Sequence, residues 1–97
     1  MKVRYRGRAL ADLEQIFQYI DKRSPSGARN VMDEIHAAIN AIAEYPLSGQ
    51  QTSYPRINVK IVRRYRYRIF YVVEADQIEI LHVRRGARRP WPPEVTC

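Results

Sequence analysis

The sequence predicts an α+β fold, in which a helix hairpin packs on a small antiparallel β-sheet in the order β-α-α-β-β-β. Three observations support this prediction. Apolar residues recur at helical spacing between residues 9 and 45, apolar and polar residues alternate between residues 57 and 83, and short turn-forming segments separate the runs. A chain of 97 residues is near the usual size for one hydrophobic core, so we expect residues 1–97 to form a single domain.

The N-terminal segment predicts a short strand and then a helix. Lys2 to Arg6 alternates basic and apolar residues, which is typical of a strand at the edge of a sheet. From Ala9 the spacing becomes helical, and we expect about three turns of an amphipathic helix. The segment DKRSPSG ends this helix, and Ser24 is suited to cap the next one, with Pro25 at its first position. The expected apolar face consists of Leu10, Leu13, Phe17 and Ile20.

A longer second helix follows, and Pro46 ends it. The segment EYPLSGQ then forms a turn. Two helices joined by a short loop predict an antiparallel hairpin, in which each helix has one apolar face to cover. The apolar stripe of the second helix consists of Val31, Met32, Ile35, Ala38, Ile39, Ile42 and Ala43.

Three strand-like runs make up the second half of the chain. The first alternates Ile57, Val59 and Ile61 with Asn58, Lys60 and Val62, and a turn near Arg64 leads into the second. In that second run, Tyr67, Ile69, Tyr71 and Val73 share one face, and Arg66, Arg68, Phe70 and Val72 share the other. The segment EADQ connects it tightly to the third run, IEILHV. Short connections predict an antiparallel meander, and the helix hairpin can cover one of its faces.

Charge is distributed unevenly along the chain, whose formal net charge is +7. Residues 1–50 contain seven basic and six acidic residues, whereas residues 51–97 contain ten basic and four acidic ones. This asymmetry predicts a basic surface built by the second half, which suits an acidic partner such as nucleic acid or an acidic protein segment. A contribution to solubility alone is the alternative interpretation.

Several classes of protein are disfavoured by the composition. The one cysteine, Cys97, excludes an internal disulfide framework and a zinc-type ligand cluster, and a reducing cytoplasm is the natural compartment. His36 and His82 are far apart without ligand spacing, so neither a metal nor another cofactor is expected. The apolar runs are too short to span a membrane, and the N-terminus lacks the pattern of a secretory signal.

Basic residues cluster on and after the predicted strands. Six Lys and Arg residues and no acid lie between Arg56 and Arg68, and four more arginines follow the last strand. On a meander these sets should converge at one face and one end of the sheet. Solvated arginines that guard a strand edge are the alternative, but the clustering favours a binding surface. The candidate binding residues are Lys60, Arg63, Arg64, Arg66, Arg68, Arg84, Arg85, Arg88, Arg89 and Trp91.

Catalytic patterns are sparse in this sequence. It contains no suggestive Ser/His/Asp spacing and no glycine-rich phosphate loop. His82 lies among apolar residues of a predicted strand, which favours a packed histidine over a general base, and His36 is interpreted as structural. Tyr67 and Tyr71 share a face with Ile69 and are expected in the core. Trp91 lies between two prolines and either packs the tail down or offers an aromatic platform beside the arginines.

The ordered set ADLEQIFQYI, AIAEYPLSGQ and YRIFYVVEADQIEILHVRRGARR resembles the RelE/ParE superfamily of type II toxin–antitoxin systems, over nearly the whole span from Arg8 to Arg89. The helical half and IEILHVRRGAR are most similar to the ParE branch. The resemblance implies a small cytosolic bacterial toxin that arrests growth and is held inactive by an antitoxin, whose C-terminal segment wraps around it. ParE-type members block DNA gyrase, whereas RelE-type members cleave mRNA on the ribosome with basic residues and a C-terminal tyrosine.

Residue by residue, the resemblance separates these two branches only in part. Arg68 in YRIFY and Arg88 in GAR match the RelE-type arginines, and Lys60 is the one lysine near the position of the family's lysine pair. No tyrosine follows Gly86, and the tail contains Trp91 and prolines instead. These departures favour a gyrase-binding toxin without enzymatic activity. The alternatives are a RelE-like endoribonuclease and a basic binding module without toxicity.

Overall fold

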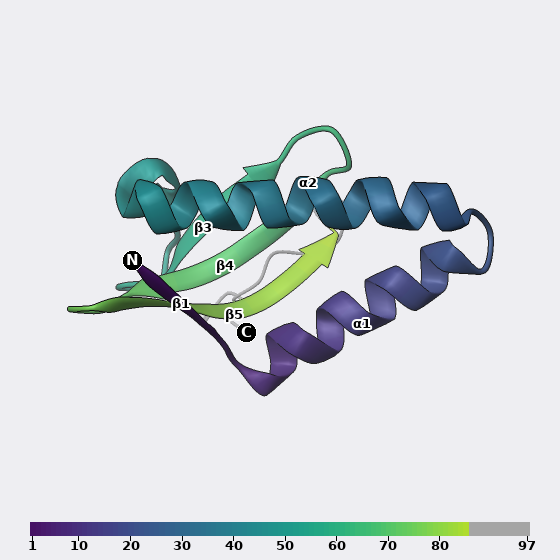
Figure 1. Ribbon diagram of the computed structural model, residues 1–97. Helices are drawn as coiled ribbons and strands as arrows, with labels where there is room; N and C mark the ends of the chain where they lie inside the picture. The colour runs from purple at the N-terminus through teal and green to yellow at the C-terminus, as the bar shows by residue number, and fades with distance from the viewer. Residues whose placement is uncertain (86–97) are drawn as a thin grey trace.

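The structure is a computed structural model that describes residues 1–85. The elements are β1 (Lys2–Tyr5), α1 (Gly7–Asp21), α2 (Pro25–Glu44), the short 3-10 helix η1 (Pro46–Ser48), β2 (Gln50–Gln51), β3 (Asn58–Val62), β4 (Tyr67–Val73) and β5 (Gln77–Arg85). The long helix α2 lies across the sheet, and α1 runs beside β5 (Figure 1). The predicted order of elements is confirmed, with the two-residue β2 as an addition. Within residues 1–85, neither helix is long and apolar enough to cross a membrane.

The five strands form one sheet in the order β1-β5-β4-β3-β2. The pairs β2–β3, β3–β4 and β4–β5 are antiparallel, which confirms the predicted meander. β1 lies at the edge, as expected, but it runs parallel to β5, with Lys2 opposite Gln77. The sheet is therefore mixed rather than wholly antiparallel. The reason is topological, because the helix hairpin carries the chain across the sheet between β1 and the meander, and parallel pairing needs such a crossover.

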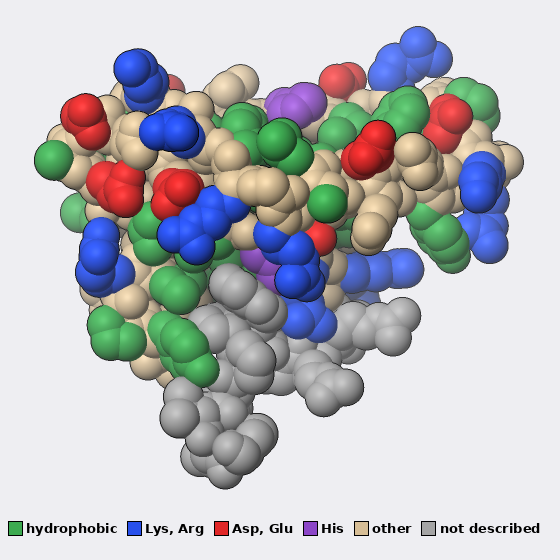
Figure 2. Space-filling model, turned by 90° about the horizontal axis from the view of Figure 1, so that it is seen from below, with side chains coloured by type: hydrophobic (Ala, Val, Ile, Leu, Met, Phe, Trp, Pro, Cys, Tyr) green, Lys and Arg blue, Asp and Glu red, His purple; other side chains and the backbone are tan. Residues whose placement is uncertain are grey.

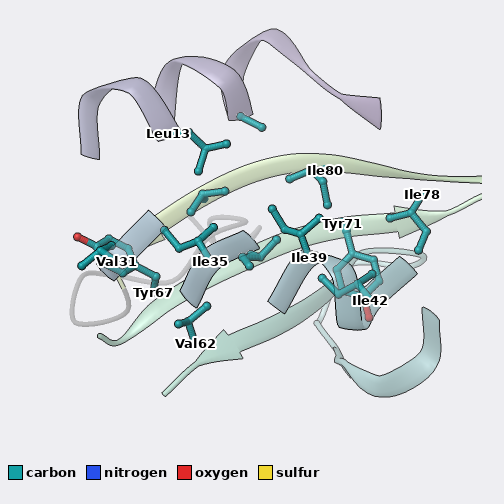
Figure 3. Close-up of a cluster of buried hydrophobic side chains, with 13 residues drawn as sticks. Leu13, Val31, Ile35, Ile39, Ile42, Val62, Tyr67, Tyr71, Ile78 and Ile80 are labelled. Atoms are coloured by element: carbon teal, nitrogen blue, oxygen red, sulfur yellow. The ribbon is translucent and has the colours of Figure 1, made fainter. Parts of the chain in front are cut away.

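The main core lies between the sheet and the two helices (Figure 3). Tyr67, Ile69 and Tyr71 of β4 face it, as the alternation predicts. Phe70 and Val72 belong instead to a second apolar cluster with Leu81, against which Ile57 and Val59 pack. β4 is therefore buried on both of its faces. The buried residues contributed to the main core by α1 and α2 are Ala9, Leu13, Val31, Ile35, Ile39 and Ile42.

The expected inward face of α1 was wrong in part. Leu10 and Phe17 are 54% and 41% exposed, whereas Ala9 is completely buried. The helix begins at Gly7 rather than near Ala9 and places Ala9, Leu13, Ile16 and Ile20 toward the core. Both faces satisfy helical spacing, and the small side chain of Ala9 allows the first turn of the helix to approach the sheet closely.

The start of α2 confirms the predicted cap. The Ser24 hydroxyl accepts a hydrogen bond from the Gly27 N–H at 3.0 Å, and Pro25 occupies the first position of the helix. The N-terminal ammonium of Met1 donates to the Ala43 carbonyl at 3.0 Å, near the other end of α2. This contact places a positive charge where the helix dipole is negative. It also ties the beginning of the chain to the helix that covers the core.

The turn after α2 is attached to β4 through the Tyr71 hydroxyl. This hydroxyl donates to the Pro46 carbonyl at 2.8 Å and accepts from the Gly49 N–H at 3.1 Å. A Cβ at position 49 would lie 2.4 Å from the Tyr71 hydroxyl oxygen and 2.7 Å from the Val59 carbonyl oxygen. The close approach of η1 to the sheet therefore requires glycine at this position.

We expect Tyr71→Phe to destabilise the fold by about 1–3 kcal/mol, because it leaves the partly buried Gly49 N–H and Pro46 carbonyl without this partner. Denaturation in urea, followed by circular dichroism, measures the change. Tyr45→Phe is the matched control, since the Tyr45 side chain is 63% exposed and should tolerate the same change. Equal losses in the two variants would contradict this account of Tyr71.

Candidate functional site

The β3–β4 hairpin and the last residues of β5 bring six arginines to one end of the sheet. Arg68 lies opposite Arg84, and Tyr67 lies opposite Arg85, in the antiparallel register of β4 and β5. The loop at residues 63–66 adds three more, because it joins Val62 to its partner Tyr67 at this same end. We call this set the basic end, and it consists of Arg63, Arg64, Arg66, Arg68, Arg84 and Arg85.

Positive charge at the basic end is weakly compensated by the protein itself. Within residues 1–85, no carboxylate forms an ion pair with Arg63, Arg64, Arg66, Arg68 or Arg85. Like charges directly opposite one another in a sheet are destabilising, and Arg68 and Arg84 are such a pair. Viewed from below, several Lys and Arg side chains lie close together across the middle of the visible surface (Figure 2). An anionic partner would relieve this repulsion.

The backbone of the hairpin loop is strained at one of these arginines. Arg66 has a φ of 60°, a left-handed conformation that glycine and asparagine adopt more easily. An arginine there costs about 1–2 kcal/mol. The loop is anchored by Tyr65, which packs against the main core, while the Arg64 guanidinium lies over the Tyr65 ring, 5.6 Å from its centroid. The loop thus holds a charged side chain where another residue type would suit the backbone better.

Lys60 lies on the opposite face of the sheet from Arg68. It lies opposite Ile69, which faces the helices, whereas Arg68 lies on the other face opposite Ile61. The Lys60 ammonium donates to the Ser48 hydroxyl at 3.2 Å. The expectation that Lys60, Arg66 and Arg68 share one face was therefore wrong for Lys60, because side chains on a strand alternate between faces. Arg88, Arg89 and Trp91 lie outside the described residues.

Asp12 of α1 is a key residue of this region that the spacing analysis treated as an ordinary polar position. Its Oδ2 accepts from the Val83 N–H at 3.0 Å and also contacts His82 Nδ1. Its Oδ1 lies 3.4 Å from Arg8 Nε, and only 11% of the Asp12 side chain is exposed. A signal was present in the sequence, since Asp12 follows Ala9 by three residues and precedes Ile16 by four, which places it on the buried stripe.

The Asp12 carboxylate binds β5 just beyond the point where β5 stops pairing with β1. β1 ends with Tyr5 opposite Ile80, and the Arg6 N–H makes a last bond to the Ile80 carbonyl at 3.0 Å. The outer edge of β5 beyond this point has no neighbouring strand in the sheet of residues 1–85. By binding the Val83 N–H, Asp12 attaches α1 to that edge just before Arg84 and Arg85.

His82 is a packed histidine, as predicted, with 4% of its surface exposed. Its ring stacks near Phe70, with 6.1 Å between centroids. Burial lowers the pKa of His82, and Arg8 and Arg84 lower it further, while the hydrogen bond and the negative charge of Asp12 raise it in part. The ring is therefore neutral at physiological pH, with its Nδ1–H directed to Asp12. His36, in contrast, is exposed on α2.

Residues 1–85 contain no group of three or more His, Cys, Asp or Glu side chains placed to hold a metal ion. The chemistry that the described surface offers is that of guanidinium groups. They carry a permanent positive charge and bind carboxylates or phosphates through two parallel hydrogen bonds.

Comparison with known proteins identifies the family of this chain. Residues 3–90 match the family model described as the ParE toxin of the type II toxin-antitoxin system, parDE. The chain belongs to the ParE toxin family. The putative toxin Y4kP of Sinorhizobium fredii is 35% identical to this ParE-family toxin over 91 residues, which cover 94% of this chain and 93% of Y4kP. Toxin RelE2 of Caulobacter vibrioides is 33% identical over 81 residues, covering 84% and 90% of the two chains.

The solved structures agree with this assignment at the level of the fold. The ParE-family toxin superposes on a chain of the chromosomal ParDE toxin–antitoxin system from P. aeruginosa with a TM-score of 0.77 and 19% identity, covering 88% of this chain and 95% of the other. The protein is thus a toxin of a type II toxin–antitoxin system in the RelE/ParE superfamily.

We expect the ParE-family toxin to lose stability on acidification because of His82. An unfolded histidine titrates near pH 6.5, and burial lowers the folded pKa of His82. The unfolded state therefore binds more protons as the pH falls through about 6.5, until the folded ring is protonated as well. The free energy of unfolding should therefore decrease as the pH is lowered, and His82 should contribute at most about 1.4 kcal/mol per pH unit to this decrease. Urea denaturation between pH 7.5 and pH 5 measures the slope.

The control uses both histidines. His82→Asn, which keeps an N–H for Asp12, should flatten the slope, whereas His36→Gln should retain it because His36 is exposed. A wild-type slope in His82→Asn would show that other groups cause the acid sensitivity.

Proposed function

We propose that the ParE-family toxin inhibits DNA gyrase in the cytoplasm, that the basic end is the surface through which it acts, and that a cognate antitoxin with an acidic segment neutralises it. The observation that carries the proposal is the composition of the basic end. Six arginines meet there, and five of them have no carboxylate partner within residues 1–85. Such a surface suits tight binding of an anionic region on a protein or on a protein–DNA complex.

Binding is favoured over cleavage by the position of the one buried histidine near these arginines. General acid–base catalysis needs a group that titrates near the working pH and reaches the substrate. The His82 side chain is buried, is hydrogen-bonded to Asp12 and has a lowered pKa. A toxin that acts by binding needs no such group, which supports a gyrase inhibitor without enzymatic activity.

The antitoxin part of the proposal has separate support. A structural neighbour belongs to a ParDE system, in which a toxin and an antitoxin occur together. An acidic segment bound over the basic end would neutralise the repelling arginines and cover the surface that is proposed to meet gyrase. One surface would then explain both activity and inhibition.

A second candidate function is RelE-like cleavage of mRNA, with the ribosome as partner. It is favoured by the relationship to Toxin RelE2, at 33% identity, and by Arg68, which could stabilise the negative charge of a phosphate in the transition state. The predicted nuclease set of Lys60, Arg68 and Arg88 has weaker support, because Lys60 lies on the other face of the sheet from Arg68. Arg88 lies outside the described residues.

We expect the purified toxin to inhibit DNA supercoiling by gyrase, and Arg68→Ala with Arg84→Ala to weaken this inhibition at least about tenfold, a loss typical of a removed charged contact. Gel assays of plasmid topology measure the effect. Arg29→Ala is the control, since Arg29 is an exposed arginine on α2. Unchanged supercoiling together with cleaved mRNA on translating ribosomes would reject the gyrase proposal and favour the RelE-like function.

Antitoxin binding should be sensitive to charge at the basic end. Reversal of charge in Arg84→Glu or Arg85→Glu should weaken the complex, and the wild-type affinity should fall as salt rises, because screening shortens the range of charge attraction. Titration calorimetry with the cognate antitoxin, at two salt concentrations, measures both effects. Affinity that is indifferent to both changes would place the antitoxin elsewhere.

A further inference from the structure

A second exposed arginine site lies at the opposite end of the sheet from the basic end. The loop at residues 52–57 joins β2 to the start of β3, whereas the arginine loop at 63–66 follows the end of β3. Arg56 is exposed in the first of these loops. The main feature of this site is that Arg56 occupies a backbone conformation that is unfavourable for arginine.

Residues Tyr54 to Ile57 form a β-turn, in which the Ile57 N–H donates to the Tyr54 carbonyl at 3.3 Å. Pro55 occupies the second position and Arg56 the third, with a φ of 71°. A turn of this type favours glycine or asparagine at its third position, because other side chains strain the left-handed backbone. Arginine therefore occupies this position at a cost in stability, as Arg66 does at the basic end.

The loop is held rigid by Thr52. The Thr52 N–H donates to the Ile57 carbonyl at 3.0 Å, and the Thr52 hydroxyl lies 2.9 Å from the same oxygen as a second donor. The hydroxyl also accepts from the Tyr54 N–H at 3.2 Å. A loop closed by these bonds presents Arg56 in a defined direction, which lowers the entropy cost of binding at this point.

A cleft lies beside this loop, and both apolar and polar residues line it. Leu47 is 84% exposed at its rim, although leucine is usually buried. Within residues 1–85, Arg56 is the only charged residue that lines the cleft, and it forms no ion pair there. The nearby Glu74, which follows Val73 at the end of β4, is already hydrogen-bonded to Gln77 at 2.7 Å. The lining residues used in this argument are Leu47, Thr52, Arg56, Asn58 and Val73.

We propose that this cleft is a second docking point for the acidic partner, distinct from the basic end. A carboxylate of the partner binds the Arg56 guanidinium, and a neighbouring aliphatic side chain packs on Leu47 and Val73. Charge complementarity identifies the occupant as an acidic, apolar segment, because the chain carries a net charge of +7 and a second copy would be repelled. The inference rests on the proposed antitoxin and is independent of the proposed action on gyrase.

Two docking points at opposite ends of one strand have a consequence for affinity. Once a single segment is bound at one end, its second contact forms at high effective concentration. The antitoxin segment would therefore span the distance from the basic end to the 52–57 loop, and each contact would strengthen the other.

The experiment titrates the isotope-labelled, full-length toxin with the peptide acetyl-Leu-Asp-Leu-amide and follows it by NMR. We expect shifts of the Arg56 side-chain N–H and the Leu47 methyl signals. The same peptide with asparagine in place of aspartate should bind at least about fivefold more weakly, because a charged hydrogen bond becomes a neutral one.

Variants of the toxin complete the test. Arg56→Gly should bind the aspartate peptide at the cleft at least about fivefold more weakly while its melting temperature rises, because the strain is removed. Arg29→Ala removes an equal charge elsewhere and should leave cleft binding unchanged. Shifts confined to the basic end, or equal cleft binding by Arg56→Gly and the wild type, would overturn the proposal. The titration does not involve gyrase, so a negative supercoiling assay leaves its result intact.

Discussion

The arrangement of this toxin depends on one carboxylate. β1 covers only the first part of the outer edge of β5, and Asp12 binds the strand where that cover ends, through the Val83 N–H and His82. The bond joins α1 to the strand that ends in Arg84 and Arg85. Because a buried N–H without an acceptor is costly, the same contact stabilises the helix hairpin, closes the sheet edge and fixes the direction in which the arginines leave the fold.

The sequence predicted the elements better than the faces they present. Periodicity was sufficient for the helix hairpin, the Ser24 cap and the placement of Tyr67 and Tyr71 in the core, because these features depend on local pattern. Lys60, Leu10 and Phe17 were misplaced because two faces of an element can satisfy the same spacing, and packing against the rest of the fold selects between them. The role of Asp12 depends on where β1 ends, which no local pattern contains. The binding roles of the arginines remain predictions.

The two left-handed arginines suggest how stability and surface chemistry are balanced here. Arg56 and Arg66 precede and follow β3, and each occupies a backbone position better suited to glycine or asparagine. Strain of this kind persists when the surrounding structure enforces it. The Thr52 hydrogen bonds and the packing of Tyr65 supply that support at the two ends. The fold is therefore locally less stable at Arg56 and Arg66, and it holds a positive charge at each end of β3.

The parallel pairing of β1 with β5 has a consequence for the order in which the molecule is made. Lys2 to Tyr5 leave the ribosome first, yet their partners Gln77 to Ile80 are among the last described residues to be synthesised. At about 5–20 residues per second, these partners appear several seconds later. Throughout that interval the sheet lacks β5, which pairs with both β1 and β4, so neither the Asp12 contact nor the basic end can form. The surface proposed to act on gyrase is therefore absent from the nascent chain until β5 has been synthesised.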